Sequence, residues 1–205
     1  MSTDSAISGV NPNVDTSRRR FLTLAASGMG VVGGAAVVWP FLASLKPSAK
    51  AQAAGAPITI DLAAIEPGQK FTTTWRGKAI WVVKRTPEMV ASLDKVKGDL
   101  IDPDSAKSTQ PEYAKNGARA IKPDVAVLIA NCTHLGCIPT FRPEYPAPDI
   151  AANWEGGFFC PCHGSKFDLA GRVFKGSPAP VNLSVPPYRF ASDAQLVVGE
   201  DQAAA

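Results

Sequence analysis

The protein has 205 residues, of which 45% are hydrophobic and 19% charged, and this composition excludes a wholly disordered chain. The net charge of +3 resides in residues 1–50, which hold five basic and two acidic side chains, whereas residues 51–205 hold sixteen of each. A nucleic-acid-binding domain carries its excess positive charge on the folded part that neutralises phosphates, so we expect no nucleic acid among the partners.

The N-terminal segment combines arginines with a long uncharged run. Residues 1–20 end in Ser17-Arg18-Arg19-Arg20, and the 25 residues that follow, 21–45, hold no charged side chain. As a helix this run would measure roughly 37 Å, against about 30 Å for the hydrocarbon core of a bilayer. We therefore predict a single-pass transmembrane anchor over residues 21–45, in contact with membrane lipid. The alternative is a signal peptide cleaved near residues 49–51, although cleavable apolar cores usually span about 7–15 residues.

The arginines bear on which side of the membrane the rest of the chain occupies. The run Ser17-Arg18-Arg19-Arg20-Phe21-Leu22 resembles a twin-arginine export signal, whose pathway carries proteins already folded around a cofactor. Alternatively, the arginines act only through the positive-inside rule. Both interpretations place residues 1–20 in the cytoplasm and residues 46–205 on the periplasmic side of a cell inner membrane.

The next segment, residues 46–57, reads KPSAKAQAAGAP and holds nothing that requires burial. It predicts a flexible hinge, although a passive spacer would have the same composition. From residue 58 onward, short β-like runs broken by Gly, Pro and Asp predict a mainly β domain, an antiparallel β-sandwich over residues 58–205. Its strands are expected at residues 58–62, 71–75, 79–84, 125–131, 157–160, 172–174, 181–185, 188–191 and 195–198.

Within this domain one helix is expected at residues 87–93, with Thr86 as its N-cap and Pro87 at its first position. The polar residues 99–124 are expected to form a surface excursion. The 22 residues 138–159 are expected to form a surface loop, which either contacts a partner or is a neutral insertion.

All four cysteines and both histidines of the chain lie between positions 132 and 163, in loops expected between the late strands. They form two runs, Cys132-Thr133-His134-Leu135-Gly136-Cys137 and Cys160-Pro161-Cys162-His163-Gly164-Ser165. A single zinc ion does not use six ligands, and structural zinc sites usually pair Cys with Cys and His with His. A disulfide-bonded domain without metal would explain the cysteines but not the histidines beside them. The pattern therefore favours a different metal centre.

The two runs resemble the cluster-binding boxes of the Rieske iron–sulfur proteins, and the resemblance extends from about residue 57 to the C-terminus. It implies one Rieske-type [2Fe–2S] cluster with two cysteines on the buried iron and two histidines on the exposed iron. Carried over to this chain, the cysteine ligands are Cys132 and Cys160, and the histidine ligands are His134 and His163.

The same resemblance implies the surroundings of the cluster. Cys137 and Cys162 would form a disulfide that joins the two loops, which an exported domain permits. The hydroxyl of Ser165 would bond a cluster sulfide and raise the reduction potential. The run GSPAP at residues 176–180 resembles the loop that covers the cluster, with Gly176, Pro178 and Pro180.

The resemblance also implies a high reduction potential. Two neutral imidazoles in place of thiolates make the cluster less negative, and Rieske potentials accordingly lie between about −150 and +300 mV. Low-potential Rieske ferredoxins and oxygenase domains lack the two extra cysteines that this chain has. Phe167 departs from the relatives of highest potential, which have tyrosine there, and we expect its missing hydroxyl to lower the potential by tens of millivolts.

The anchor, the hinge and the domain together resemble the iron–sulfur subunits of cytochrome bc complexes, the ubiquinol–cytochrome c reductases. This implies a subunit of a respiratory enzyme in a dimeric complex, with a cytochrome b subunit, a c-type cytochrome subunit and quinol as partners. The domain would take one electron, coupled to a proton, from quinol and pass the electron to the c-type cytochrome, contributing to the proton gradient.

Particular residues follow from that resemblance. His163 and His134 would be catalytic, with His163 facing quinol, while Leu135 and Gly136 would dock on cytochrome b. The alternative is a static relay subunit of an exported molybdenum oxidoreductase, which can also carry a twin-arginine signal and the disulfide.

Overall fold

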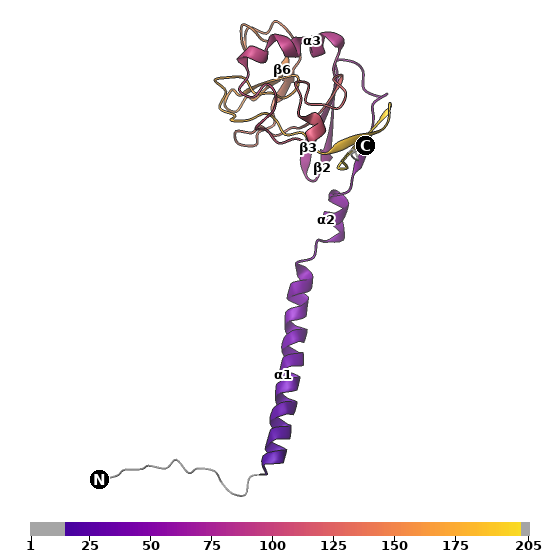
Figure 1. Ribbon diagram of the computed structural model, residues 1–205, viewed down its shortest axis with the longest axis vertical. Coiled ribbons are helices and arrows are strands. Elements are labelled where there is room, and N and C mark those ends of the chain that lie inside the picture. Colours follow the sequence, from indigo (N-terminus) through magenta and orange to yellow (C-terminus); the bar gives the residue numbers. More distant parts are fainter. Residues whose placement is uncertain (1–14, 202–205) are drawn as a thin grey trace, which may run out of the picture. The chain divides into compact units, whose positions relative to one another are not determined.

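The computed structural model describes residues 15–201 and divides the chain into two compact units, with the boundary after Lys50. Figure 1 labels helix α1 of the first unit and strands and helices of the second. The predicted boundaries at residues 20 and 45 fall close to the ends of one helix of the first unit, α1 (Thr16–Ser44).

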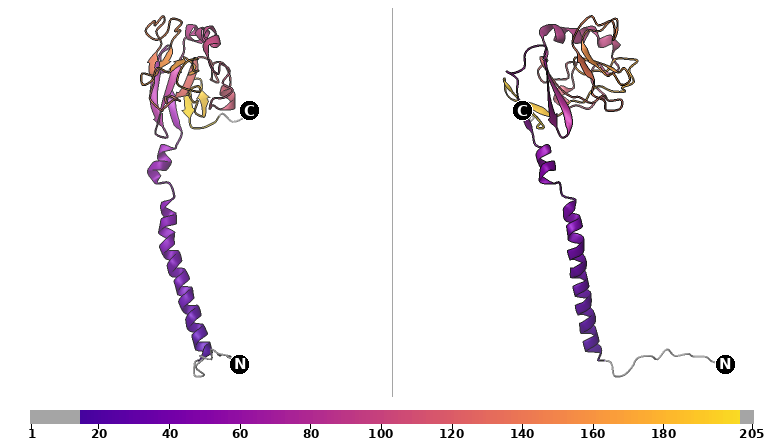
Figure 2. Two further views of the ribbon diagram at one scale, coloured as in Figure 1. Left: turned by 90° about the vertical axis from the view of Figure 1, so that its left-hand side faces the viewer. Right: turned by 180° about the vertical axis from the view of Figure 1, so that it is seen from behind.

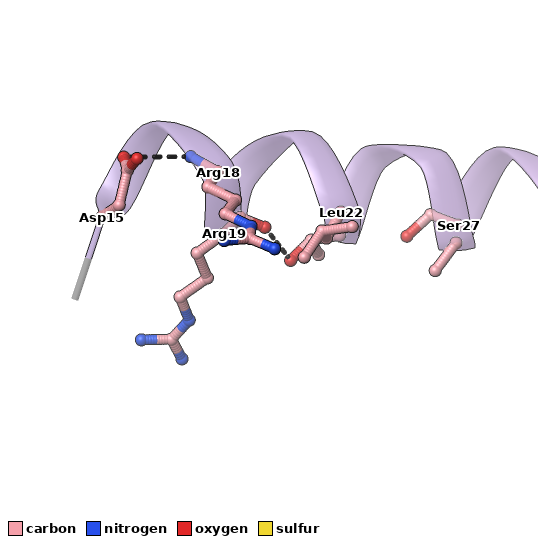
Figure 3. A pocket seen from close by; sticks show the side chains of 7 residues that line it. Asp15, Arg18, Arg19, Leu22 and Ser27 are labelled. Atoms are coloured by element: carbon pink, nitrogen blue, oxygen red, sulfur yellow. Dashed lines mark hydrogen bonds between the residues drawn. The ribbon is translucent and has the colours of Figure 1, made fainter.

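Helix α1 begins earlier than the uncharged run because Asp15 caps it. The Asp15 carboxylate accepts hydrogen bonds from the N–H groups of Ser17 at 3.0 Å and Arg18 at 3.2 Å, the latter drawn in Figure 3. Beyond this cap, Arg18, Arg19 and Leu22 line a shallow hollow on the first turns. By length and composition, α1 suffices to cross a membrane, as the predicted anchor requires.

A short helix, α2 (Ala49–Ala54), occupies the middle of the segment for which the sequence predicts a hinge without regular structure. Alanine has the most favourable helix propensity of all residues, and the segment is rich in it. The N–H group of Ala56 closes the helix by donating to the carbonyl of Ala53 at 3.1 Å. The Ala56 carbonyl in turn accepts from the indole N–H of Trp75 at 3.1 Å, so the chain is attached to the β domain from this residue onward.

The second unit contains three antiparallel sheets of three strands each, with the orders β1–β9–β8, β2–β3–β4 and β5–β6–β7. Figure 2 shows the C-terminal hairpin β8–β9 in yellow. This is the mainly antiparallel β architecture predicted from the sequence. The strands are β1 (Ile58–Asp61), β2 (Lys70–Trp75), β3 (Lys78–Lys84), β4 (Val125–Ile129), β5 (Thr140–Arg142), β6 (Gly157–Phe159), β7 (Lys166–Asp168), β8 (Tyr188–Ser192) and β9 (Gln195–Val198).

The main core lies where the sheet β2–β3–β4 packs on the sheet β5–β6–β7. Residues 80–83 of the central strand β3 are each at most 1% exposed, so both faces of this strand are covered. Trp81 of β3 stacks on Phe158 of β6, with ring centroids 4.7 Å apart and planes 7° from parallel. This contact joins the sheet β2–β3–β4, which precedes the first Cys/His loop, to the hairpin β6–β7, which carries the second Cys/His loop.

Helix α3 (Pro87–Lys95) confirms the predicted helix and extends it by two residues. The Thr86 hydroxyl accepts a hydrogen bond from the N–H group of Met89 at 3.3 Å, and Pro87 takes the first helical position. Two short 3₁₀ helices follow, η1 (Lys97–Asp99) and η2 (Glu112–Ala114).

The predicted strands 172–174 and 181–185 are wrong. Residues 173 and 174 form only isolated bridges, and residues 181–185 form no strand. The backbone N–H groups of Leu183 and Val185 donate to the carbonyls of Gly171 and Thr109, so successive residues pair with different segments and no ladder forms. Neither β5 nor β7 is predicted from the sequence.

The segments 99–124 and 138–159 lie partly at the surface, as expected, but neither is only a surface loop, because each also contributes buried side chains to the domain. In the insertion, Trp154 is 1% exposed and packs in a cluster with Val96, Leu100 and Phe174. In the segment 99–124, several polar side chains are buried and hydrogen-bonded, among them Arg119 at 0% exposure. The sequence does not predict this burial, because polar side chains attach the segment to the domain and leave no hydrophobic pattern in the sequence.

Candidate metal centre

The two Cys/His loops, residues 132–137 and 160–165, share one backbone arrangement. In each, the N–H group of a glycine donates to the carbonyl of the first cysteine: Gly136 to Cys132 at 2.8 Å, and Gly164 to Cys160 at 2.9 Å. The glycines have φ values of +81° and +76°, a left-handed conformation that other residues adopt only with strain. Each loop therefore turns back on itself directly after its histidine region.

A second pair of hydrogen bonds closes the loops. The N–H group of Cys132 donates to the carbonyl of Cys137 at 2.7 Å, and that of Cys160 donates to the carbonyl of Ser165 at 2.8 Å. Strand β4 leads toward the first loop, and the hairpin β6–β7 carries the second between its strands. Rigid strands thus position both loops.

The structure confirms the disulfide between Cys137 and Cys162. The other two cysteines, Cys132 and Cys160, are free and buried, at 3% and 1% exposure. The sulfur atoms of Cys137, Cys160 and Cys162 lie within 4.8 Å of one another, but two of them are taken by the disulfide. This group therefore cannot supply the thiolates of a structural zinc site.

The two histidines, one in each Cys/His loop, lie close together. The imidazole rings of His134 and His163 lie 4.7 Å apart between centroids and are nearly perpendicular, at 89°. The Nδ1 atom of His134 is buried and has no hydrogen-bond partner among residues 15–201. A buried, unpaired ring nitrogen is costly unless it binds something, and a metal ion is the ordinary partner for such an atom. His163 is exposed to solvent.

The Cys160 thiol has a raised pKa because burial disfavours the thiolate. Hydrogen bonds from the N–H groups of Cys162 and His163 to its sulfur act in the opposite direction. The thiol therefore stays protonated until a cation replaces the proton, and the two N–H groups are already placed to stabilise the thiolate so formed.

Ser165 is fully buried, and its hydroxyl oxygen accepts a hydrogen bond from the N–H group of Ala179 at 3.1 Å. This contact leaves the hydroxyl hydrogen of Ser165 available to a further acceptor. Ala179 belongs to the segment 173–182, called the cover loop below, in which Pro178 and Pro180 are exposed and Gly176 makes a turn. The cover loop, which contains the predicted cover residues 176–180, thus contacts the second Cys/His loop.

Two apolar side chains stand exposed on the first loop and just after it. Leu135, predicted as a docking residue, is 71% exposed, and its neighbour Gly136 is also exposed. Ile138 is 58% exposed and was not predicted, although its place directly after Cys137 in a polar turn region is a signal in the sequence. The two exposed side chains lie three residues apart, on and next to the first Cys/His loop.

Phe167, predicted to influence the metal centre from β7, is fully buried and belongs to the same hydrophobic cluster as Cys132 and Cys160. Thr133 is a further contact that the sequence did not indicate. Its hydroxyl donates to the carbonyl of Val181 at 2.6 Å and so ties the first loop to the end of the cover loop. A threonine inside a ligand run gives no signal of such a bond.

This donor set fits a Rieske-type [2Fe–2S] cluster. Two buried thiols, two neighbouring imidazoles and N–H donors aimed at a sulfur match what such a cluster requires. The structure brings together predicted site residues from three segments: the loops 132–137 and 160–165 and the cover loop.

Comparison with known proteins agrees with this geometry. Residues 107–188 match the Rieske [2Fe-2S] domain family, and residues 10–48 match the family described as the ubiquitinol-cytochrome C reductase Fe-S subunit TAT signal. The chain is 50% identical over 192 residues to the ubiquinol-cytochrome c reductase iron-sulfur subunit of Allochromatium vinosum, covering 94% of this chain and 93% of that protein. It is 43% identical over 189 residues to the subunit of the same name from Blastochloris viridis, covering 90% and 94%. A solved structure described as a hyperthermophilic respiratory Complex III is similar with a TM-score of 0.48 and 27% identity, covering 85% of this chain and 98% of that one.

Proposed function

Since the chain belongs to the family of ubiquinol–cytochrome c reductase iron–sulfur subunits, we propose that it carries single electrons from quinol, at a cytochrome b subunit, to a c-type cytochrome subunit. The observation that carries this proposal is the pair of loops with two free buried cysteines, two facing histidines and the disulfide between them. It occurs in a chain with the anchor helix and the export-signal match that an exported, membrane-attached subunit needs.

We assign the cluster ligands as Cys132 and Cys160 on one iron, and His134 and His163 on the other. When bound, the [2Fe–2S] cluster supplies one-electron redox chemistry at high potential. Burial of the two cysteines excludes water from their thiolates, and the buried Nδ1 of His134 faces inward while its Nε2 remains for the outer side. We propose that Ser165 directs its free hydroxyl hydrogen to a cluster sulfide.

The exposed imidazole of His163 carries the proton part of the proposal. With one ring nitrogen engaged on iron, its other nitrogen faces solvent and can accept a proton from a quinol hydroxyl. His134 is only partly exposed, so His163 is the better placed of the two to meet quinol.

We propose that Leu135 and Gly136 form the docking surface for cytochrome b. The substitution Leu135→Asp should then reduce quinol-dependent cytochrome c reduction strongly while leaving the cluster spectrum and potential unchanged. Phe71→Asp provides a matched control, because Phe71 is an apolar side chain on β2 that is also exposed, at 42%. Equal losses in the two variants would contradict a docking role for Leu135.

We propose that residues 1–20 lie in the cytoplasm, that α1 anchors the chain in the inner membrane, and that residues 46–57 let the domain at 58–205 move on the periplasmic side between its partners. Replacing residues 51–54 by prolines would break α2 and stiffen this segment. Turnover should fall while the cluster spectrum stays intact, and unchanged turnover would contradict the moving-domain proposal.

Purification of the full chain from membranes tests the assignment as a whole. The proposal requires b- and c-type haems to co-purify with the protein, in a complex that reduces cytochrome c with quinol. Co-purification of molybdenum without haem b would contradict it and support a relay in a molybdenum oxidoreductase.

A further inference from the structure

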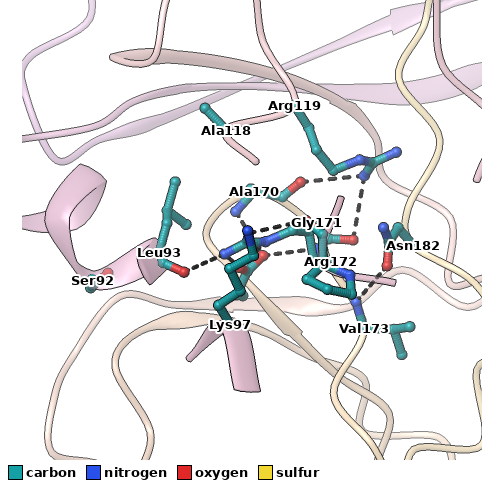
Figure 4. A network of polar contacts seen from close by, with 12 residues as sticks. Ser92, Leu93, Lys97, Ala118, Arg119, Ala170, Gly171, Arg172, Val173 and Asn182 are labelled. Atoms are coloured by element: carbon teal, nitrogen blue, oxygen red, sulfur yellow. Dashed lines mark hydrogen bonds and ion pairs between the residues drawn. The ribbon is translucent and has the colours of Figure 1, made fainter. Parts of the chain in front are cut away.

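Asn182, at the end of the cover loop, is a fully buried side chain that neither metal ligation nor docking uses. Its Oδ1 accepts a hydrogen bond from the N–H group of Val173 at 2.9 Å, a contact visible in Figure 4. Val173 and Asn182 are the first and last residues of the cover loop. One side-chain amide therefore closes this ten-residue segment (173–182) at its base.

The amide nitrogen of Asn182 ties that base to a different part of the chain. Its Nδ2 donates to the carbonyl of Asp102 at 2.9 Å and to the hydroxyl of Ser105 at 3.1 Å. The backbone N–H group of Asn182 donates to the hydroxyl of Ser108 at 3.1 Å. Every donor and acceptor group of this buried amide is thus engaged, which holds the side chain in one orientation.

The partner segment is itself held firmly. The Asp102 carboxylate accepts hydrogen bonds from the N–H groups of Ala106 at 2.7 Å and Lys107 at 3.0 Å, and from the Ser108 hydroxyl at 2.9 Å. Residues 102–108 thereby form a compact turn, and Asn182 is bonded to that turn at three points. Residues 102–108 therefore support the end of the cover loop.

The C-terminal part of the cover loop, close to Asn182, meets the two Cys/His loops. Ala179 donates its N–H group to the Ser165 hydroxyl oxygen at 3.1 Å, and Val181, next to Asn182, accepts from the Thr133 hydroxyl at 2.6 Å. Asn182 is therefore one residue from the contact with Thr133 and three residues from the contact with Ser165.

We propose that Asn182 is a positioning residue for the metal centre: it braces the cover loop on residues 102–108 and, through Ala179, orients the hydroxyl of Ser165 toward the cluster. This inference rests on the proposed function, in which Ser165 donates a hydrogen bond to a cluster sulfide. It assigns a role in setting the reduction potential to a side chain that lies outside both ligand loops.

The test is a double-substitution cycle in the full chain in membranes, with the potential followed by EPR during redox titration. Asn182→Ala should lower the potential, by no more than Ser165→Ala does. In the combined variant the two shifts should not add, because Asn182 acts through Ser165. An unchanged potential in Asn182→Ala, or fully additive shifts, would overturn the inference while leaving the proposed function standing. An unchanged potential in Ser165→Ala would instead refute the role of Ser165, and the inference with it.

Two further variants separate positioning from general damage. Asn116→Ala removes another amide that closes a loop, through bonds to the carbonyls of Tyr113 at 3.1 Å and Ala120 at 3.0 Å, and should leave the potential unchanged. If Asn182→Ala does not assemble, Ser108→Ala weakens the same brace more gently and should shift the potential in the same direction by a smaller amount. Ser108→Ala should also speed hydrogen exchange in residues 173–182 of the purified chain, and unchanged exchange and potential would contradict the brace.

Discussion

The two Cys/His loops have the same backbone and different surroundings. In both, the carbonyl of the first cysteine accepts a hydrogen bond from a glycine of positive φ, and the N–H group of the same cysteine donates to the carbonyl of the last residue of the loop. The first loop exposes Leu135 and keeps His134 partly covered, whereas the second exposes His163 and buries Ser165. Under the proposed function the common backbone would hold the ligands, and the different surroundings would divide the remaining tasks: contact with a partner at the first loop, tuning and proton acceptance at the second.

The first way to test this comparison is to remove one cysteine ligand from each loop. Cys132→Ala and Cys160→Ala should each abolish the cluster, because in the proposed ligation each loop would contribute one buried thiolate to the same iron. Iron and sulfide content, with EPR of the reduced protein, measures the loss. A cluster retained in either variant would show that the loops do not share ligation equally.

The second test removes a buried ion pair next to strand β7, which follows the second Cys/His loop. Asp168, at the end of β7, pairs with Arg172 at 2.7 Å, and both side chains are at most 2% exposed. Asp168→Asn leaves the buried guanidinium without its counter-charge, and we expect a destabilisation of about 3–5 kcal/mol. The melting temperature of the domain should fall clearly, with loss of the cluster on heating.

An exposed ion pair serves as the control for that test. Lys122 and Asp193 are 2.7 Å apart, but their side chains are 41% and 100% exposed. Asp193→Asn should leave the melting temperature almost unchanged, because water solvates both charges. Similar losses in Asp168→Asn and Asp193→Asn would contradict the special role of the buried pair.

The third test asks whether strain at the positive-φ glycine destabilises the two Cys/His loops equally. Gly136→Ala and Gly164→Ala should each destabilise the domain by about 1 kcal/mol, because alanine is strained at positive φ. No atom lies within 4 Å of the added methyl group at either position, so backbone strain is the only cost. Denaturation of the two variants side by side should give matching shifts, and a clear difference would show that the loops are held differently.

The fourth and smallest effect concerns tuning. Phe167→Tyr places a hydroxyl in the cluster of side chains that includes both free cysteines. One new hydrogen bond to a ligand sulfur should raise the potential by about 20–60 mV. Redox titration measures the shift, and no rise would mean that the hydroxyl reaches no sulfur from β7.

Much of this architecture could be predicted where the determinants are local. The Thr86 cap of α3, strand β9 and the two ligand runs each carry their signal within a few residues. The apolar pattern of residues 181–185 predicts a strand, but the N–H groups of Leu183 and Val185 donate to the carbonyls of Gly171 and Thr109, in two different segments, rather than to one partner strand. Pairing of that kind depends on the whole fold.

The candidate site shows the same division. The expected ligands, the disulfide partners and Ser165 could be named through the resemblance of the two runs to the Rieske boxes, whereas the contacts of Thr133 and Asn182 could not. Their hydrogen bonds span 48 residues in the case of Thr133 and 80 residues between Asn182 and Asp102. Buried polar contacts over such separations leave neither periodicity nor a motif in the sequence.

EPR at low temperature, on membranes reduced with ascorbate, tests the central claim most directly, because this mild reductant reaches only a cluster of high potential. We predict a rhombic signal of low average g that shifts when a quinone-site inhibitor is added. A signal that appears only with dithionite would contradict quinol oxidation by this protein, and no signal with either reductant, together with bound zinc, would contradict the cluster itself.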